Sequence, residues 1–90
     1  MKNPYPLSDI SERISQLSPK EIEAFFQAFF TPQETETLQG RVALIEKLLE
    51  GSPQREVADE LGISFSQITR GSRELKYGAG KKFFPLFFRK

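Results

Sequence analysis

Cysteine and histidine are both absent from this chain of 90 residues. The lack of cysteine excludes disulfides and thiolate metal sites and is compatible with a reducing cytoplasm, the predicted localisation. The lack of histidine removes the most common general base and metal ligand, and no nucleophile–base pair stands out, so we expect neither catalysis nor a bound metal. No apolar run is long enough to span a bilayer, and the N-terminus lacks the apolar core of a signal peptide.

Charges of both signs are present in nearly equal number but are unevenly distributed. Up to Leu61 there are six basic and eleven acidic residues, whereas from Gly62 onward there are seven basic residues and one acid, Glu74. The balance is −5 before this point and +6 after it, which gives the net charge of +1. A basic C-terminal part beside an acidic body is typical of proteins that bind nucleic acid. A basic tail exposed to solvent is the alternative.

The stretch Pro53–Lys76 has the pattern of two short helices joined by a tight turn. Ser52 is predicted to cap the first helix, because proline follows it at the first helical position, where a missing N–H costs nothing. Gly62 ends this helix, since a residue without a Cβ suits a positive φ angle. Small and apolar residues occur where the two helices would cross, namely Val57, Ala58, Leu61, Ile63 and Ile68. This spacing fits a helix-turn-helix.

The second helix of this stretch is predicted to run from about Phe65 to Lys76, with Ser64 as its cap. Its remaining surface is polar or basic until Glu74. Such a face can lie in the major groove of DNA, with hydrogen bonds to bases and positive charge near phosphates. An ordinary helical hairpin within an all-α core is the alternative. The predicted inner side consists of Ile68, Gly71, Ser72 and Leu75.

Two more helices are predicted nearer the N-terminus, after a loose arm formed by Met1–Leu7. Ser8 or Asp9 can cap the first, and Ser18 followed by Pro19 starts the second. Four phenylalanines on one face of the second helix are more than a small monomer covers easily, so we infer that a second subunit helps to cover them. A monomer with an aromatic core is the alternative. The apolar stripe consists of Ile22, Phe25, Phe26, Phe29 and Phe30.

A central helix is predicted from Thr31, which opens a capping box with Glu34, to about Glu50. Arg41 lies on the apolar stripe of this helix, between Leu38 and Ile45. A guanidinium there needs a carboxylate, carbonyl groups or an aromatic face as a partner. An arginine whose stem packs while its head reaches water is the alternative.

The C-terminal segment contains four phenylalanines and Pro85. Their spacing of four residues suits a short amphipathic helix, but Pro85 indicates that such a helix begins near it or is bent. We expect this segment to dock onto the aromatic helix Ile22–Phe30, either of the same chain or of a partner subunit. Binding to a membrane surface is a weaker alternative.

These features resemble the Trp repressor family over roughly residues 28–76. The most specific motif is Ile68-Thr69-Arg70-Gly71-Ser72. The N-terminal helices are shorter than the family's, and the tail with Pro85 does not match its final helix. The other matching segments are Phe30-Thr31-Pro32-Gln33-Glu34, Gly40-Arg41-Val42, Leu49-Glu50-Gly51, Gln54-Arg55-Glu56, Glu60-Leu61-Gly62 and Leu75-Lys76.

The resemblance implies an all-α fold, an intertwined helical homodimer with a helix-turn-helix DNA-binding motif. The chain would be a single domain over residues 1–90, with the helix-turn-helix at about 53–76. The dimerisation core would comprise about 8–50 together with the C-terminal segment 81–90.

The resemblance also implies a repressor that binds L-tryptophan as corepressor and then binds an operator palindrome in double-stranded DNA. It would control genes of tryptophan biosynthesis or uptake. In the family two arginines sandwich the indole ring, and Arg41 and Arg70 occupy their positions here. A stacked ligand would explain why Arg41 lies on an apolar stripe, because a planar guanidinium packs well on an aromatic ring. Arg70 would also pair with the ligand carboxylate, its alternative role being a phosphate contact.

Further positions complete the implied ligand site. Thr31 would help to bind the carboxylate, and Gly71 would leave room for the ring. The carbonyl groups of Ala28 and Phe30 would face the ligand ammonium from the partner subunit. Glu74 stands where the family usually has a serine near the ammonium. A carboxylate there would either bind the ammonium more strongly, or pair with an arginine of the same helix and hinder binding of the ligand carboxylate.

The implied DNA contacts fall into two groups. Backbone-positioning contacts would come from Gln54, Arg55, Ser72 and Lys76. Contacts to base edges would come from Phe65, Ser66, Gln67 and Thr69, next to the capping Ser64. For Phe65, contact with thymine methyl groups and burial in the core are both open.

Two other functions remain open from the sequence. A Trp-repressor-like regulator with a different ligand, or with none, is compatible with Glu74 and the short N-terminus. The second alternative is a helical subunit that binds other proteins through its phenylalanines and does not bind DNA.

Overall fold

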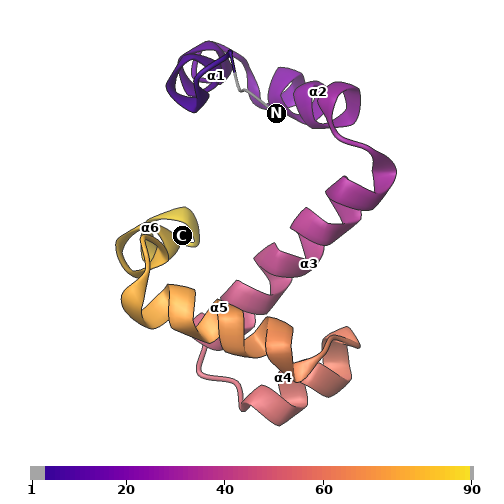
Figure 1. Ribbon diagram of the computed structural model, residues 1–90, viewed down its shortest axis with the longest axis vertical. Coiled ribbons are helices and arrows are strands. Elements are labelled where there is room, and N and C mark those ends of the chain that lie inside the picture. Colours follow the sequence, from indigo (N-terminus) through magenta and orange to yellow (C-terminus); the bar gives the residue numbers. More distant parts are fainter. Residues whose placement is uncertain (1–3, 90) are drawn as a thin grey trace. The chain divides into compact units, whose positions relative to one another are not determined.

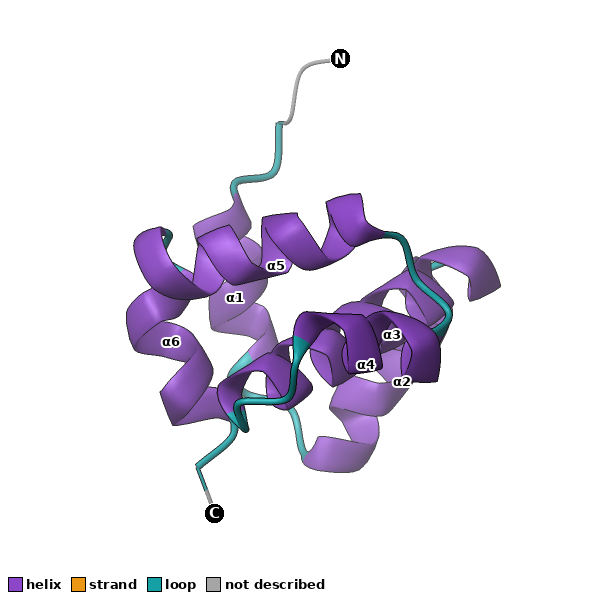
Figure 2. Ribbon diagram, turned by 90° about the horizontal axis from the view of Figure 1, so that it is seen from below, coloured by secondary structure: helices purple, strands orange, loops and turns teal. Residues whose placement is uncertain are grey.

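The computed structural model describes residues 4–89, and all regular secondary structure in that range is α-helical, as predicted (Figures 1 and 2). The chain divides into two compact units, residues 1–35 and 36–90. No helix of the described range is both long and apolar enough to cross a membrane. The helices are α1 (Leu7–Ile14), α2 (Pro19–Phe29), α3 (Pro32–Leu49), α4 (Gln54–Leu61), α5 (Phe65–Tyr77) and α6 (Gly80–Phe87).

Helix α1 begins at Leu7, before either of the predicted caps. Pro6 is its N-cap, in an extended conformation, and the Pro6 carbonyl accepts hydrogen bonds from the amides of Asp9 and Ile10. The prediction that Ser8 or Asp9 caps this helix is therefore wrong. Of the predicted N-terminal arm, residues 1–3 lie outside the described range, and Pro4–Pro6 precede the helix.

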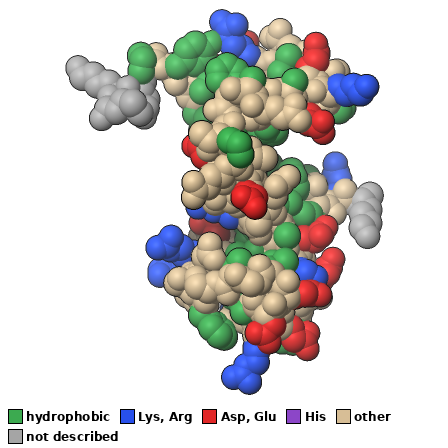
Figure 3. Space-filling model, turned by 90° about the vertical axis from the view of Figure 1, so that its right-hand side faces the viewer, with side chains coloured by type: hydrophobic (Ala, Val, Ile, Leu, Met, Phe, Trp, Pro, Cys, Tyr) green, Lys and Arg blue, Asp and Glu red, His purple; other side chains and the backbone are tan. Residues whose placement is uncertain are grey.

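Helix α2 begins as predicted, with a capping box. The Ser18 hydroxyl accepts from the Glu21 amide at 3.2 Å, and the Glu21 carboxylate accepts from the Ser18 amide at 2.9 Å. No residue of α2 is fully buried, and Phe29 is 76% exposed. The aromatic rings pack mainly on one another, with centroids 5.0 Å apart for Phe25–Phe29 and 5.3 Å apart for Phe26–Phe30. Hydrophobic side chains thus remain at the surface, as Figure 3 shows for one face.

Helix α3 starts with the predicted capping box between Thr31 and Glu34. The Thr31 hydroxyl accepts from the Glu34 amide at 3.1 Å, and the Glu34 carboxylate accepts from the Thr31 amide at 2.9 Å. Its later turns supply the buried residues Leu44 and Ile45. The remaining core of the C-terminal unit is Val57 and Ile68, with Leu48, Ala58, Leu61 and Ile63 packed against it.

Helices α4 and α5 form the predicted pair. Gly62 ends α4 in the left-handed conformation, with φ 64°, and Ser64 forms a capping box with Gln67 at the start of α5. The predicted cap Ser52 is wrong, because Pro53 itself is the N-cap of α4 and no side chain caps that end. One ion pair joins α4 to α3, in which Lys47 Nζ lies 2.7 Å from Glu60 Oε2. The hydrogen bond to Glu60 raises the pKa of the Lys47 ammonium.

Helix α6 begins at Gly80 rather than near Pro85, which lies inside the helix. Of the two predicted possibilities, a helix that starts near Pro85 is therefore wrong, and a bend at Pro85 stays a prediction. The aromatic residues form a chain of contacts along α6, with ring centroids 5.9 Å apart for Phe83–Phe87 and 4.9 Å apart for Phe87–Phe88. Phe83 and Phe87 are 56% and 57% exposed. This helix thus presents an apolar surface that the C-terminal unit does not cover.

Candidate functional site

The outer face of α5 is exposed because its inner face is fixed to the core. Ile68 is completely buried and Gly71 is buried, whereas Ser72 and Leu75 are half-buried. The predicted inner side of this helix is therefore confirmed. The candidate DNA-contacting residues lie mainly on exposed surface, namely Gln54, Arg55, Ser64, Phe65, Ser66, Gln67, Thr69 and Lys76, while Ser72 is half-buried.

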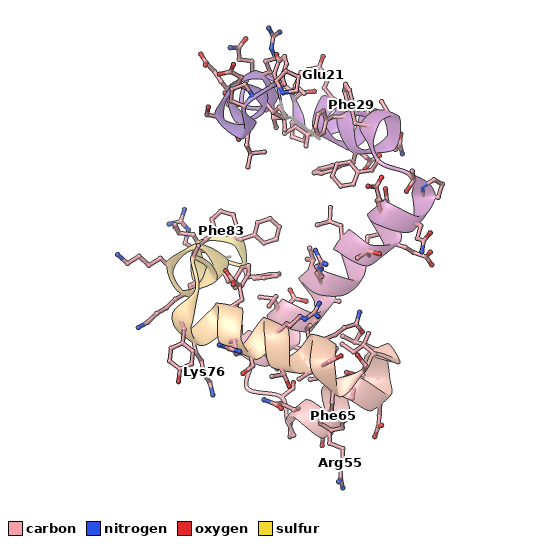
Figure 4. The ribbon with its side chains drawn as sticks, viewed as in Figure 1. Glu21, Phe29, Arg55, Phe65, Lys76 and Phe83 are labelled. Carbon is pink, nitrogen blue, oxygen red and sulfur yellow. The ribbon has the colours of Figure 1, made fainter. Side chains whose placement is uncertain are left out.

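Phe65 is 56% exposed, so of its two possible positions it takes the surface one. Figure 4 shows Phe65, Arg55 and Lys76 along the same lower edge of the α4–α5 pair. An apolar ring and two cations are thus displayed on one side of the pair. Such a surface can meet both base edges and phosphates.

Local hydrogen bonds fix the polar side chains at the start of α5. Gln67 Oε1 accepts from the Ser64 amide at 3.2 Å, which leaves the side-chain NH2 group of Gln67 as a donor. The Ser64 and Ser66 hydroxyl oxygens lie 2.9 Å apart, and the Thr69 hydroxyl donates to the Phe65 carbonyl at 2.9 Å. These bonds pre-order the end of the helix that would reach the bases, at little further entropic cost on binding.

The basic side chains of α5 are not neutralised by nearby acids. Within the described residues, the ion pair Lys47–Glu60 is the only one, and it lies between α3 and α4. Neither Arg70 nor Arg73 pairs with Glu74, although both belong to α5. The positive charge of α5 therefore remains available to an anion.

Arg41 belongs to α3 and Arg70 to α5, two helices that meet at Gly71. A Cβ atom at Gly71 would lie 3.0 Å from Leu44 Cδ2 and 3.4 Å from Ile45 Cδ1, so the two helices approach closely there. Arg70 is next to Gly71, and Arg41 lies one helical turn before Leu44 on α3. Both arginines are exposed. The two arginines thus belong to helices that are in contact, while their sandwiching of a ligand stays a prediction.

The missing side chain of Gly71 has a role that the sequence did not reveal. The space beside it is filled by Leu44 and Ile45 of α3. Gly71 is therefore required for the close approach of α5 to α3. Its expected role beside a ligand ring stays a prediction.

Three of the candidate ligand residues belong to the N-terminal unit. Ala28 and Thr31 are exposed, and Phe30 is half-buried. Because the Thr31 hydroxyl accepts from the Glu34 amide, its own proton remains free for donation to an acceptor. That these three residues meet a ligand held by the arginines stays a prediction.

Glu74 has a partner that sequence reasoning missed. Its Oε1 atom accepts from the Gly80 amide at 3.4 Å, so the carboxylate lies at the first residue of α6. In the sequence, Gly78 and Gly80 gave no sign that the Glu74 carboxylate lies beside them.

The described part of the chain offers no group of side chains for a metal ion. Between residues 4 and 89, no three histidine, cysteine or acidic residues are grouped to hold a metal ion. A hollow of about 310 Å³ lies between α3 and α6, away from both arginines. It is lined by Glu46, Leu49, Glu50, Pro85 and Phe88.

Comparison with known proteins gives consistent matches. Residues 6–84 match the family described as Trp repressor protein. A Trp operon repressor homolog of Chlamydia caviae is 40% identical over 70 residues, which cover 76% of this chain and 69% of that protein. One of Vibrio parahaemolyticus is 38% identical over 63 residues, covering 69% of this chain and 61% of that protein.

A third relative, the Trp operon repressor homolog of Vibrio cholerae, is 42% identical over 55 residues, covering 60% of this chain and 53% of that protein. The matched segments thus span between 53% and 69% of the length of these three relatives. No solved structure is significantly similar to the chain.

Proposed function

The chain belongs to the Trp repressor family, a family of DNA-binding transcriptional regulators, and we propose that it represses transcription with L-tryptophan as its corepressor. In this proposal a homodimer in the cytoplasm binds the amino acid and then an operator palindrome. The regulated genes would serve tryptophan biosynthesis or uptake.

The observation that carries the DNA-binding part is the exposed face of α5, held at a defined angle by its buried Ile68 and its capping box. Phe65, Ser66, Gln67 and Thr69, next to the capping Ser64, would approach base edges. The NH2 group of Gln67 would donate to base acceptors, and the Phe65 ring would contact thymine methyl groups. The phosphate backbone would be contacted by Gln54, Arg55, Ser72 and Lys76.

Dimerisation is supported by the apolar surface that the chain leaves exposed. Phe29 of α2 and Phe83 and Phe87 of α6 are each more than half exposed. We propose that these surfaces meet between two copies of the chain, which buries aromatic area that water would otherwise contact. In helix-turn-helix dimers, the Trp repressor among them, the two recognition helices stand about 34–36 Å apart to enter successive major grooves.

The ligand part is supported by two exposed arginines on α3 and α5, helices that approach closely at Gly71. In the proposal, Arg41 and Arg70 stack on the two faces of the indole ring, with Gly71 beside it. Arg70 and the free hydroxyl proton of Thr31 bind the carboxylate. The ammonium is met by Glu74 and by the carbonyl groups of Ala28 and Phe30 of the second subunit.

In the proposed mechanism, the ligand acts by selecting one arrangement of α4–α5 relative to the dimer core. An amino acid wedged between Arg41 on α3 and Arg70 on α5 favours the spacing that fits DNA. The ligand shifts the equilibrium between the two arrangements by at most the ratio of its affinities for them. The factor by which the ligand raises the affinity for DNA equals the factor by which DNA raises the affinity for the ligand.

The first experiment is a calorimetric titration of the chain with L-tryptophan. Because the chain has no tryptophan residue, indole fluorescence gives a second reading without a protein background. We expect saturable binding of one ligand per subunit. Selection from a random pool of duplex DNA should then enrich a palindrome when L-tryptophan is present and much less when it is omitted.

Controls separate the parts of this proposal. The double variant Gln67→Ala/Arg70→Ala should lose the selected DNA and keep the helical fold. An unchanged affinity for that DNA would show that this face of α5 does not contact it, and failure to enrich any DNA sequence would favour an interaction subunit that does not bind DNA.

A second function keeps the DNA and omits the amino acid, as a regulator with a different ligand or none. It is favoured by one observation, the engagement of Glu74 with α6 where the family usually has a serine. Enrichment of the same palindrome with and without L-tryptophan would select this second function.

A further inference from the structure

The corner where α5 ends and α6 begins carries a dense group of cations. From Arg73 to Lys82 the sequence has four basic residues and a single acid, Glu74. The four basic residues, here called the basic corner, are Arg73 and Lys76 on α5 and Lys81 and Lys82 on α6. All four are exposed, and in the range that the structure describes their side chains make no hydrogen bond and no ion pair.

Glu74 does not neutralise the basic corner. A Cβ atom at Gly78 would overlap both carboxylate oxygens of Glu74, and Oε1 accepts from the Gly80 amide at 3.4 Å. The carboxylate is thus directed at the backbone of the helix break and pairs with none of the four cations. Their positive charge is therefore available to an anion outside the chain.

Backbone contacts hold the start of α6 against the end of α5. The Gly78 amide donates to the Glu74 carbonyl at 3.1 Å, and the Lys81 amide donates to the Gly78 carbonyl at 3.1 Å. Gly80 is buried, and a Cβ atom there would overlap the ring of Phe84. The lysines of α6 thus belong to a helix seated on α5, and not to the solvent-exposed basic tail that was one alternative from the sequence.

The charged and the aromatic sides of α6 differ. At 3.6 residues per turn, Lys81 and Phe83 lie about 200° apart around the helix axis. Figure 4 shows Phe83 on the side of α6 that faces away from Lys76. The proposed function assigns the exposed Phe83 and Phe87 to the dimer interface. Lys81 can therefore meet an anion without displacing that interface.

The basic corner continues the edge of the α4–α5 pair that is proposed to contact DNA. Lys76 ends this edge in Figure 4, and Lys81 is hydrogen-bonded to Gly78, only two residues beyond Lys76. Duplex DNA carries one phosphate charge for about every 1.7 Å of its axis. A basic surface that extends past Lys76 would therefore meet further phosphates. This continuity favours DNA over a membrane as the partner of the basic corner.

We propose that Lys81 and Lys82 bind backbone phosphates of the operator, as a second phosphate-binding segment that continues the surface of α5 onto α6. This inference rests on the DNA-binding part of the proposed function and does not depend on the ligand. Contacts to phosphate carry no sequence information. The two lysines thus raise the affinity for the operator and for unrelated duplex DNA alike, and they make binding more sensitive to salt.

The test compares the full-length wild type with three double variants, each in the presence of L-tryptophan. Lys81→Gln/Lys82→Gln removes both charges, whereas Lys81→Arg/Lys82→Arg keeps them. Arg13→Gln/Lys20→Gln is the matched control, because it removes the same charge from exposed positions on α1 and α2. Each protein is titrated with two duplexes of equal length, the selected palindrome and an unrelated sequence.

Fluorescence anisotropy of labelled duplexes over a range of salt concentrations gives the first reading. Each phosphate contact contributes about −0.9 to the slope of the logarithm of the binding constant against the logarithm of salt concentration. Loss of two lysines from each subunit of a dimer should make this slope less negative by about 3–4. Both duplexes should lose affinity by a similar factor, and the arginine variant and the control should keep the wild-type slope.

Ethylation of individual phosphates on the palindrome gives the second reading, which locates the contacts. Some phosphates should weaken binding of the wild type when ethylated and have no effect on binding of Lys81→Gln/Lys82→Gln. The arginine variant should show the wild-type set. The same set of interfering phosphates in the wild type and in the glutamine variant would overturn the proposal.

Three further results would overturn it. They are a wild-type slope in the glutamine variant, an equal change of slope in the control, and a loss of affinity confined to the palindrome. Binding to phosphatidylglycerol vesicles that requires the two lysines, with an unchanged slope on DNA, would assign the basic corner to a membrane surface instead.

Failure of the proposed repressor function gives a different result. The wild type would then bind both duplexes equally, with or without L-tryptophan, while the change of slope would still report on the two lysines. A wild type that binds neither duplex would overturn the phosphate contacts as well.

Discussion

Single residues without side chains decide how closely the helices of the C-terminal unit approach. Gly71 lets α5 lie against Leu44 and Ile45 of α3. Gly78 makes room for the Glu74 carboxylate at the end of the same helix. These contacts are steric, since neither glycine has a positive φ angle. The position of α5, and of the side chains on its outer face, thus depends on the absence of a few atoms.

Gly71→Val is expected to lower the free energy of unfolding by about 1–3 kcal/mol, because its methyl groups would overpack the contact with Leu44. Urea unfolding followed by circular dichroism measures the loss. Gly40→Val is the control, since nothing lies within 4 Å of a Cβ atom there. Equal losses in the two variants would show that α3 does not constrain Gly71.

Arg41→Ala is expected to abolish the response of DNA binding to L-tryptophan and to leave the dimer intact. The reason is that one face of the ligand ring would lose its stacked guanidinium, while the exposed arginine contributes nothing to the core. DNA binding with and without the amino acid, together with sedimentation, measures both properties. Arg13→Ala, on α1, is the control. A retained response would contradict the proposed sandwich.

Among the elements, the helix starts show which parts of the fold follow from local sequence. Serine or threonine caps with a glutamate or glutamine three residues later were predicted correctly at Ser18, Thr31 and Ser64. Ser52 fails as a cap because the third residue after it is Arg55, which offers no acceptor for the reciprocal bond. Pro53 takes the N-cap position instead. Reciprocal side-chain bonds, rather than the serine–proline pair alone, thus identify a helix start.

Ser64→Ala is expected to lower the free energy of unfolding by about 1 kcal/mol, through loss of the hydroxyl that accepts from the Gln67 amide. Ser52→Ala should change it little, because no side chain caps α4. Thermal or urea unfolding of both variants at one chain concentration makes the comparison. A larger loss in Ser52→Ala would contradict the assignment of Pro53 as the N-cap.

Contacts between elements were less accessible from the sequence than the elements themselves. The inner face of α5 was predicted correctly, because Ile68 and Leu75 follow helical periodicity. The contact of Glu74 with Gly80 was not predicted, because it depends on where α6 starts. Pro85 had wrongly suggested a later start of that helix. For the candidate site, periodicity marked Arg41 as anomalous, but the packing of Gly71 on α3 required the three-dimensional arrangement.

For the molecule as a whole, the notable property is how much aromatic surface the chain leaves uncovered. Helices α1 and α2 contain no fully buried residue, and α6 exposes Phe83, Leu86 and Phe87. Exposed apolar surface of this kind marks interaction sites. The proposal of a homodimer rests on this property.

Truncation after Lys82 is expected to weaken the dimer, because it removes the exposed phenylalanines of α6. Sedimentation over a range of concentrations measures the dissociation constant. Truncation after Phe88, which removes only Arg89 and Lys90, is the control. A dimer that is equally strong in both truncated chains would remove the proposed role of α6.

The buried apolar side chains of the described residues are Leu44, Ile45, Val57 and Ile68, a very small core. A chain with so small a buried core gains much of its thermal stability from association with a partner. For the proposed homodimer, dilution alone should then lower the melting temperature. In a cell that makes few copies of the chain, its folded state as well as its activity would depend on dimerisation.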